Sequence, residues 1–199
     1  AVDHIRGASS EPVVLLGHSA GGHTMLEAAA LRPDQTLGLA LISSVGIQPH
    51  RAIGKERGFR NVVQPLAKSS LRPPWRTLLG AAFVFVLQLS ALLGLPQRVT
   101  ADELLYVQRR TGLYDFARAA SNAKALACPV LHAYACDDPL IQPERASELV
   151  EVLARDVQRD GPRLCWEAGG HYVQQTHASE LAEALEDWVL TLERLDLSV

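Results

Sequence analysis

Short, mainly apolar runs alternate with stretches of helical periodicity at both ends of this chain. The runs predict strands at 13–16, 36–44, 129–135 and 163–168. Apolar residues between and after them recur at helical spacing, which predicts helices at 24–31, 142–155 and 178–195. Runs without an alternating polar position are typical of parallel strands that helices cover on both faces. The pattern therefore predicts a doubly wound, mostly parallel α/β sheet, preceded by the end of a helix at 2–7.

The first predicted strand leads directly into Gly-His-Ser-Ala-Gly-Gly at residues 17–22, and a predicted helix follows. Gly-x-Ser-x-Gly between a strand and a helix indicates a nucleophile elbow, a strained turn that lifts the serine above the sheet. Small residues let the strand and the helix approach there, and we attribute this room to Gly17 and Gly21. The helix directs its positive dipole end at Ser19, and the Ala20 N–H is the expected oxyanion donor. The competing interpretation is a turn serine without chemistry.

Residues suited to acid–base chemistry follow the last two predicted strands. Asp137 and Asp138 come directly after the third strand, where a parallel sheet has its ligand crevice. Gly169-Gly170-His171 opens a loop after the fourth. A neutral histidine can accept a serine proton near pH 7 and return it to a leaving group. The alternative role of both aspartates is to form a turn before the helix that begins near Pro143.

Residues 12–31 resemble the nucleophile region of the α/β-hydrolase superfamily, and the likeness extends more loosely over most of the chain outside its middle. The resemblance implies a catalytic triad in the order serine, acid, histidine, with Ser19 as nucleophile and His171 as base. The acid of relatives ends a small-x-x-Asp turn, which selects Asp138, although Ala135 replaces the usual glycine; Asp137 is the alternative. Relatives with haloalkane or epoxide chemistry carry an aspartate at the elbow, so Ser19 argues against those activities.

The remaining histidines fit less specific roles. His18, at the variable position of the elbow, is interpreted as a substrate-binding or packing residue. His132 lies inside a predicted strand, where a hydrogen-bonded core histidine is expected. His50 carries no pattern.

The alternation of strands and helices stops after residue 45, where prolines divide the sequence into short pieces. The resemblance implies an inserted helical cap, or lid, at 46–125, within a core formed by 1–45 and 126–199. Two short helices at 102–110 and 113–122 are predicted to complete this cap.

The longest apolar run, at 78–95, lies inside this insertion. It is about long enough to cross a bilayer, and Arg72, Arg76 and Arg98 flank it. Three interpretations are a cap helix, a membrane-surface contact and a span; Gln88, Ser90 and two glycines weaken the span, which would also divide one sheet. We favour the cap, whose apolar pocket would indicate an apolar substrate.

The superfamily has several strands before the nucleophile strand, together with a loop that donates a second oxyanion N–H. The strand at 13–16 is therefore expected at a bare sheet edge, which favours unwanted pairing. We expect the chain to be part of a larger hydrolase. A minimal variant, or a chain completed by a partner that pairs with 13–16, is the alternative.

Composition narrows the classes further. The chain has 199 residues, enough for one domain with a subdomain, and a net charge of −3 without a basic stripe argues against a nucleic-acid partner. The three cysteines are too few and dispersed for a disulfide framework and lack metal-ligand spacing. They are interpreted as reduced, mostly buried thiols, which favours a reducing compartment such as the cytoplasm. No metal or cofactor is expected.

These patterns predict a serine hydrolase that cleaves an ester, thioester or amide of a mainly apolar small molecule or lipid through an acyl-enzyme. Ser19, Asp138 and His171 would form the triad, and the Ala20 N–H would bind the oxyanion. The alternative is a non-catalytic binding protein on the same fold, because loss of one oxyanion donor can cost about two to three powers of ten in rate.

Overall fold

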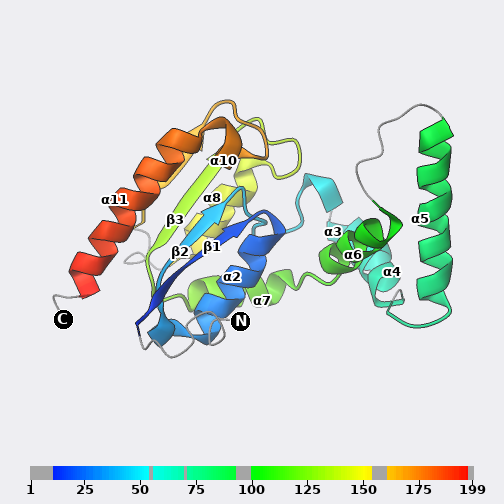
Figure 1. The fold of residues 1–199 in the computed structure, drawn as a ribbon. Coiled ribbons are helices and arrows are strands. Elements are labelled where there is room, and N and C mark those ends of the chain that lie inside the picture. Colours follow the sequence, from blue (N-terminus) through cyan, green and yellow to red (C-terminus); the bar gives the residue numbers. More distant parts are fainter. Residues whose placement is uncertain (1–10, 54–55, 70, 93–99, 154–160, 197–199) are drawn as a thin grey trace. The chain divides into compact units, whose positions relative to one another are not determined.

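The computed structural model describes residues 11–53, 56–69, 71–92, 100–153 and 161–196 (Figure 1). The predicted helix end at 2–7 lies outside them. Four strands form one sheet in the order β1-β2-β3-β4, and every neighbouring pair is parallel. The strands are β1 (Val13–His18), β2 (Thr36–Ile42), β3 (Val130–Ala135) and β4 (Arg163–Trp166). This sheet confirms the predicted doubly wound, parallel α/β class.

The chain divides into two compact units, residues 1–52 with 116–199 and residues 53–115. The helices of the first unit are α2 (Ala20–Leu31), η1 (Pro33–Gln35), α7 (Phe116–Lys124), α8 (Pro143–Val152), α10 (Val173–Thr176) and α11 (Ala178–Asp196). A short η2 (Arg51–Ile53) spans the end of its first segment at residue 52. The second unit contains α3 (Glu56–Gly58), the π-helical η3 (Phe59–Val63), α4 (Gln64–Ser69), α5 (Trp75–Leu92) and α6 (Ala101–Gly112).

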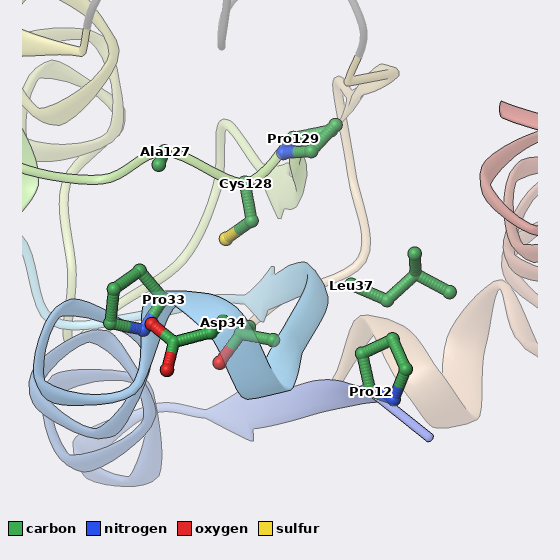
Figure 2. Close-up of a pocket in the computed structure, with 8 residues that line it drawn as sticks. Pro12, Pro33, Asp34, Leu37, Ala127, Cys128 and Pro129 are labelled. Carbon is green, nitrogen blue, oxygen red and sulfur yellow. The ribbon is translucent and has the colours of Figure 1, made fainter. Parts of the chain in front are cut away.

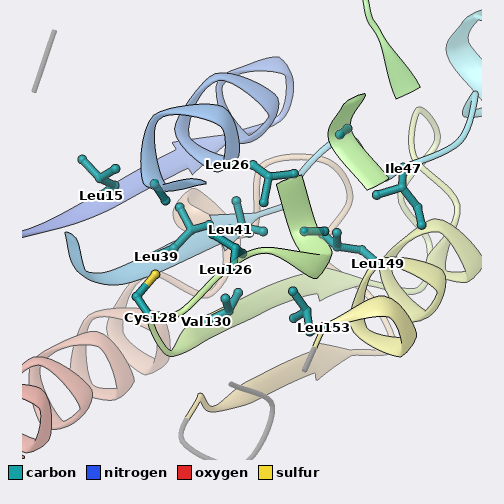
Figure 3. Packing of buried hydrophobic residues seen from close by; sticks show 13 residues of the cluster. Leu15, Leu26, Leu39, Leu41, Ile47, Leu126, Cys128, Val130, Leu149 and Leu153 are labelled. Carbon is teal, nitrogen blue, oxygen red and sulfur yellow. The ribbon is translucent and has the colours of Figure 1, made fainter. Parts of the chain in front are cut away.

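Both faces of the sheet are covered by helices, which explains why β2 is a continuous apolar run. Leu39 and Leu41 point into a cluster shared with α2, α7 and α8, where Leu26 and Leu149 are buried (Figure 3). The alternate residues of β2 pack with α10 and α11 on the other face; they include Ala40 and Ile42, and the partner side chains are Val173, Trp188 and Leu192. Period-two alternation thus places apolar residues in two cores.

β1 is the edge of the sheet in the part of the chain that the structure describes, since it pairs with β2 alone. Leu16, on this strand, is 50% exposed. An edge strand with exposed apolar side chains is open to pairing with another strand. The expected edge position of residues 13–16 is therefore observed, whereas a partner that completes the sheet stays a prediction.

The boundary of the second unit differs from the expected limits of the cap. Residues 116–124 form α7, which packs on the sheet through Ala119 and Ala123 instead of joining the insertion. The apolar run at 78–95 lies in α5, up to Leu92. Several large side chains of α5 are exposed, namely Trp75, Leu78, Val84, Phe85 and Val86. Within the described residues, no helix is long and apolar enough to cross a membrane. A membrane-surface contact and the role of this unit as a cap stay predictions.

The cysteines differ from the expected buried thiols. Cys128 is buried in the core, and burial raises its pKa to about 11. Cys136 and Cys165 are both exposed, and their sulfur atoms lie 3.3 Å apart. The sequence did not reveal this pairing because it depends on the register between β3 and β4.

His132 is a fully buried histidine in the middle of β3, and only 2% of its surface is exposed. Neither ring nitrogen has a hydrogen-bond partner among the described residues, so the expectation of a satisfied core histidine is wrong. Burial, with a smaller effect from the Arg163 charge, lowers the pKa of His132 to about 4. The ring is therefore neutral in the folded protein at neutral pH.

The lowered pKa of His132 predicts a loss of stability in acid. An unfolded chain binds a proton to this ring below its ordinary pKa of 6.5, whereas the folded chain does so only near 4. The contribution of neutral His132 to the free energy of unfolding is present above pH 6.5. It is lost as the pH falls toward 4, by about 3 kcal/mol in total. We expect His132→Leu to flatten the pH dependence of the free energy of unfolding over this interval, measured by urea denaturation. An unchanged slope would contradict this role for His132.

Candidate active site

Ser19 occupies a strained turn between β1 and α2. Its φ of 53° and ψ of −123° lie where non-glycine residues are rare, at a cost of about 1–3 kcal/mol. The turn is held by the end of β2 and the segment that follows it: the Ser19 N–H donates to the Ile42 carbonyl at 3.0 Å, and the Val45 N–H donates to the Ser19 carbonyl at 3.2 Å. The neighbouring strand thus fixes the conformation that raises the Ser19 side chain.

Close packing of β1 on α2 depends on Gly17 and Gly22. A Cβ atom on Gly17 would lie 2.6 Å from Cα of Gly22, and one on Gly22 would overlap the side chain of Ser44. A Cβ atom on Gly21 would meet nothing within 4 Å. The expected role of Gly17 is confirmed and that of Gly21 is wrong, because Gly22 is the helix residue that faces the strand.

Three strands bring Ser19, His171 and Asp138 together at the carboxyl edge of the sheet. Ser19 follows β1, Asp138 follows β3 and His171 follows β4. Nε2 of His171 lies 2.9 Å from Oγ of Ser19, and its Nδ1 lies 2.8 Å from Oδ2 of Asp138. An ionised carboxylate only accepts hydrogen bonds, so Nδ1 carries the proton and Nε2 is free to accept from the serine hydroxyl. This tautomer is the one that a general base requires.

The two adjacent aspartates hold different parts of this arrangement. Oδ1 of Asp138 accepts the N–H groups of Leu140 and Ile141 at 2.8 and 3.0 Å, and the side chain is only 1% exposed. These bonds leave Oδ2 directed at His171. Asp137 instead accepts the N–H groups of Gly169 and Gly170 at 2.9 and 2.8 Å. Asp137 therefore contacts the backbone of the histidine loop, while Asp138 contacts the ring.

The loop that presents His171 is also tied to α10. Gly170 has a φ of +64°, a conformation that favours glycine directly before His171. The Thr176 hydroxyl donates to the Gly169 carbonyl at 3.0 Å, and Nε2 of His177 donates to the Ala168 carbonyl at 2.7 Å. These roles of Thr176 and His177 were not predicted, because no motif in the sequence marks a residue that only holds a loop.

His18 and His50 form hydrogen bonds with the backbone of the two loops that carry His171 and Asp138. Nε2 of His18 donates to the His171 carbonyl at 2.9 Å, and the two rings lie 4.9 Å apart. Nδ1 of buried His50 donates to the carbonyl of Leu140 at 3.2 Å, next to the turn of Asp138. Burial lowers the pKa of His50, which favours its neutral form. His18 thus holds the histidine loop, and its predicted contact with substrate stays a prediction.

The structure also has a pocket far from these residues. Its volume is about 300 Å³, and Pro12, Pro33, Asp34, Leu37, Ala127, Cys128 and Pro129 are among the residues that line it (Figure 2). These residues lie at the amino ends of β1, β2 and β3. Ligands of open parallel sheets bind at the carboxyl ends, so this pocket is not the site formed by Ser19 and His171.

Comparison with known proteins agrees with the fold. The model of the "Alpha/beta hydrolase family" matches residues 1–184, and the chain belongs to this family. No curated protein matches the sequence.

Solved structures with the same fold include a monoacylglycerol lipase from Paleococcus ferrophilus, with 21% identity and a TM-score of 0.64 over 96% of this chain and 73% of that one. A thermophilic esterase from Thermogutta terrifontis has 15% identity and a TM-score of 0.61 over 96% and 71% of the two chains. A lipase-esterase related protein from Clostridium acetobutylicum has 16% identity and a TM-score of 0.59 over 94% and 72%. At these identities the likeness establishes the fold alone.

Proposed function

We propose that this protein is a serine hydrolase that cleaves acyl compounds through a covalent acyl-enzyme. The observation that carries the proposal is the continuous chain of hydrogen bonds from Ser19 through His171 to buried Asp138. A serine hydroxyl is a weak nucleophile unless an adjacent base accepts its proton. The strained turn at Ser19 adds support, since such strain persists where the surroundings impose it, often at active sites.

Each residue has a defined part in the proposed reaction. Oγ of Ser19 attacks the substrate carbonyl while Nε2 of His171 takes the hydroxyl proton. His171 then gives this proton to the leaving group, which departs and leaves the acyl group on Ser19. A water molecule, deprotonated by His171, attacks the acyl carbonyl and releases the acid. Asp138 keeps the ring oriented and stabilises the imidazolium in both steps.

The amino end of α2 would stabilise the oxyanion of each tetrahedral intermediate. Ala20 is the first residue of this helix, and the N–H groups of a first helical turn have no acceptor within the helix. The dipole of α2 adds a partial positive charge at the same place. We assign the Ala20 N–H as the first oxyanion donor on this ground.

An ester with an apolar acyl group is the substrate class that we propose, with thioesters and amides as related candidates. Membership of the α/β-hydrolase family and the lipase and esterase identities of the structural neighbours support acyl transfer. The exposed apolar side chains of α5, such as Leu78 and Phe85, supply surface for an apolar group if the second unit serves as the cap.

A fluorophosphonate probe tests whether Ser19 is activated. The probe reacts with a nucleophilic serine, whose Oγ bonds to phosphorus as fluoride leaves. We expect rapid labelling of the wild-type chain, none at this position in Ser19→Ala, and labelling slower by about 10³-fold or more in His171→Ala. Ser43→Ala is the matched control, because Ser43 also follows a strand with positive φ, but its buried Oγ has no hydrogen-bond partner among the described residues.

Labelling that is equal in the wild type and Ser19→Ala would overturn the proposed nucleophile. A folded wild-type chain without any labelling would instead favour the alternative of a binding protein on a hydrolase fold.

A further inference from the structure

Cys136 and Cys165 lie side by side on neighbouring strands. Cys136 directly follows β3 and Cys165 is part of β4, where it is paired with Tyr134. The backbones are joined at this point, because the Cys136 N–H donates to the Trp166 carbonyl at 2.8 Å. The sulfur atoms are 3.3 Å apart, and both residues are exposed.

The two sulfur atoms are close enough that a small movement would join them in a disulfide bond. The register pairs Cys165 with Tyr134, so Cys136 lies diagonally across from Cys165, where Cα atoms of neighbouring strands are about 7–8 Å apart. This separation is slightly above the usual range for a disulfide. An S–S bond of about 2.05 Å requires the sulfur atoms to approach by little more than 1 Å, and at this diagonal a small shift of the short strand β4 accompanies the side-chain rotation. Exposure lets an oxidant reach both thiols, in contrast to buried Cys128.

We propose that Cys136 and Cys165 form a reversible disulfide bond that fastens the end of β3 to β4. A small-molecule disulfide, such as oxidised glutathione, is the oxidant. One thiolate attacks it, which gives a mixed disulfide on the protein and releases one small thiol. The second cysteine, as thiolate, attacks the bonded protein sulfur and releases a second small thiol. The two protein thiols are thereby oxidised, and their two electrons and protons reside on the two released thiols.

The position of the bond defines its effect. Cys136 stands directly before Asp137 and Asp138, and β4 leads into the loop of Gly169 and His171. β4 has only four residues and pairs with β3 alone in the part of the chain described, so few backbone bonds hold it. A disulfide here prevents the strand that carries the acid from separating from the strand that leads to the histidine. This effect is structural and does not depend on the proposed hydrolase activity.

Disulfide exchange requires a thiolate. The hydrogen bond with Cys165, together with desolvation and nearby negative charges, raises the pKa of Cys136, so mildly alkaline conditions suit the test. The full chain, first reduced, is incubated with oxidised glutathione at about pH 8.5. We expect a monomer that has lost two of its three free thiols and whose mass is lower by two hydrogen atoms. Its Tm should rise by about 5 to 10 °C and return to the starting value after reduction.

Three single variants provide the comparison. Cys136→Ser and Cys165→Ser should form no disulfide within the chain. Oxidised glutathione can give them only a mixed disulfide with glutathione, and their Tm should not show the rise expected for the wild type. Cys128→Ser, which removes the buried thiol, should still form the bond and show the full rise. Three free thiols in the oxidised wild type, bonds between chains on a non-reducing gel, or an internal bond without a rise in Tm would each overturn the proposal.

Discussion

Asp138→Asn is expected to lower kcat for ester hydrolysis by about 10⁴-fold, with a smaller change in KM. The buried carboxylate accepts the Nδ1 proton of His171 at 2.8 Å, whereas an asparagine amide can donate to Nδ1 and so favours the tautomer with the proton on Nε2. That tautomer cannot accept the proton of Ser19. Hydrolysis of a chromogenic ester of a short-chain acid measures the loss, which rests on the proposed function.

The matched control is Asp137→Asn. Asp137 accepts two backbone N–H groups, from Gly169 and Gly170, and an asparagine carbonyl oxygen can still accept them. We expect kcat to stay within about tenfold of the wild type, since a hydrogen bond to a charged acceptor exceeds a neutral one by only about 1 kcal/mol. Equal losses in the two variants would contradict the assignment of Asp138 as the acid.

Gly17→Ala is expected to lower the free energy of unfolding by about 3–5 kcal/mol. Its Cβ would lie 2.6–2.8 Å from backbone atoms of Gly21 and Gly22, and backbone cannot rotate away as a side chain can. β1 and α2 would have to separate, which also disturbs the turn at Ser19. Urea denaturation measures the change, and it requires no active enzyme.

Gly21→Ala is the control within the same helix. The new methyl group has open space, and alanine is favoured over glycine inside a helix by up to about 1 kcal/mol. We expect stability equal to or above that of the wild type. A large loss of stability in Gly21→Ala, or an unchanged stability in Gly17→Ala, would contradict the close contact between β1 and α2 at Gly17.

Sequence reasoning was most successful where a local pattern determines the structure. The apolar runs predicted all four strands, because a strand buried on both faces leaves no room for alternating polar residues. The elbow and the loop of His171 lie directly after strands, so parallel topology alone brings them to one edge. Ser19 and Asp138 each lie within hydrogen-bond distance of His171 there, and the catalytic roles of the three residues stay a prediction.

Features that depend on contacts between distant segments were not predictable. The sequence spacing does not show that Gly22 rather than Gly21 faces the strand, because this depends on how α2 crosses β1. The closeness of the Cys136 and Cys165 sulfur atoms depends on the register of two strands. The hydrogen bond from His18 to the His171 carbonyl joins residues 153 positions apart. Residues 116–124 were assigned to the insertion because nothing in their composition shows that Ala119 and Ala123 are buried against the sheet.

The hydrogen bonds that hold the turn at Ser19 bear on biosynthesis. A chain leaves the ribosome from its amino end, so Ser19 emerges before Ile42 and Val45, the partners that hold its strained backbone. Until β2 is available, nothing offsets the cost of that conformation and the nascent turn relaxes. His171 emerges 152 residues after Ser19. If Ser19 is the nucleophile, as we propose, a ribosome-bound chain therefore carries no reactive serine until nearly all of this sequence is outside the exit tunnel.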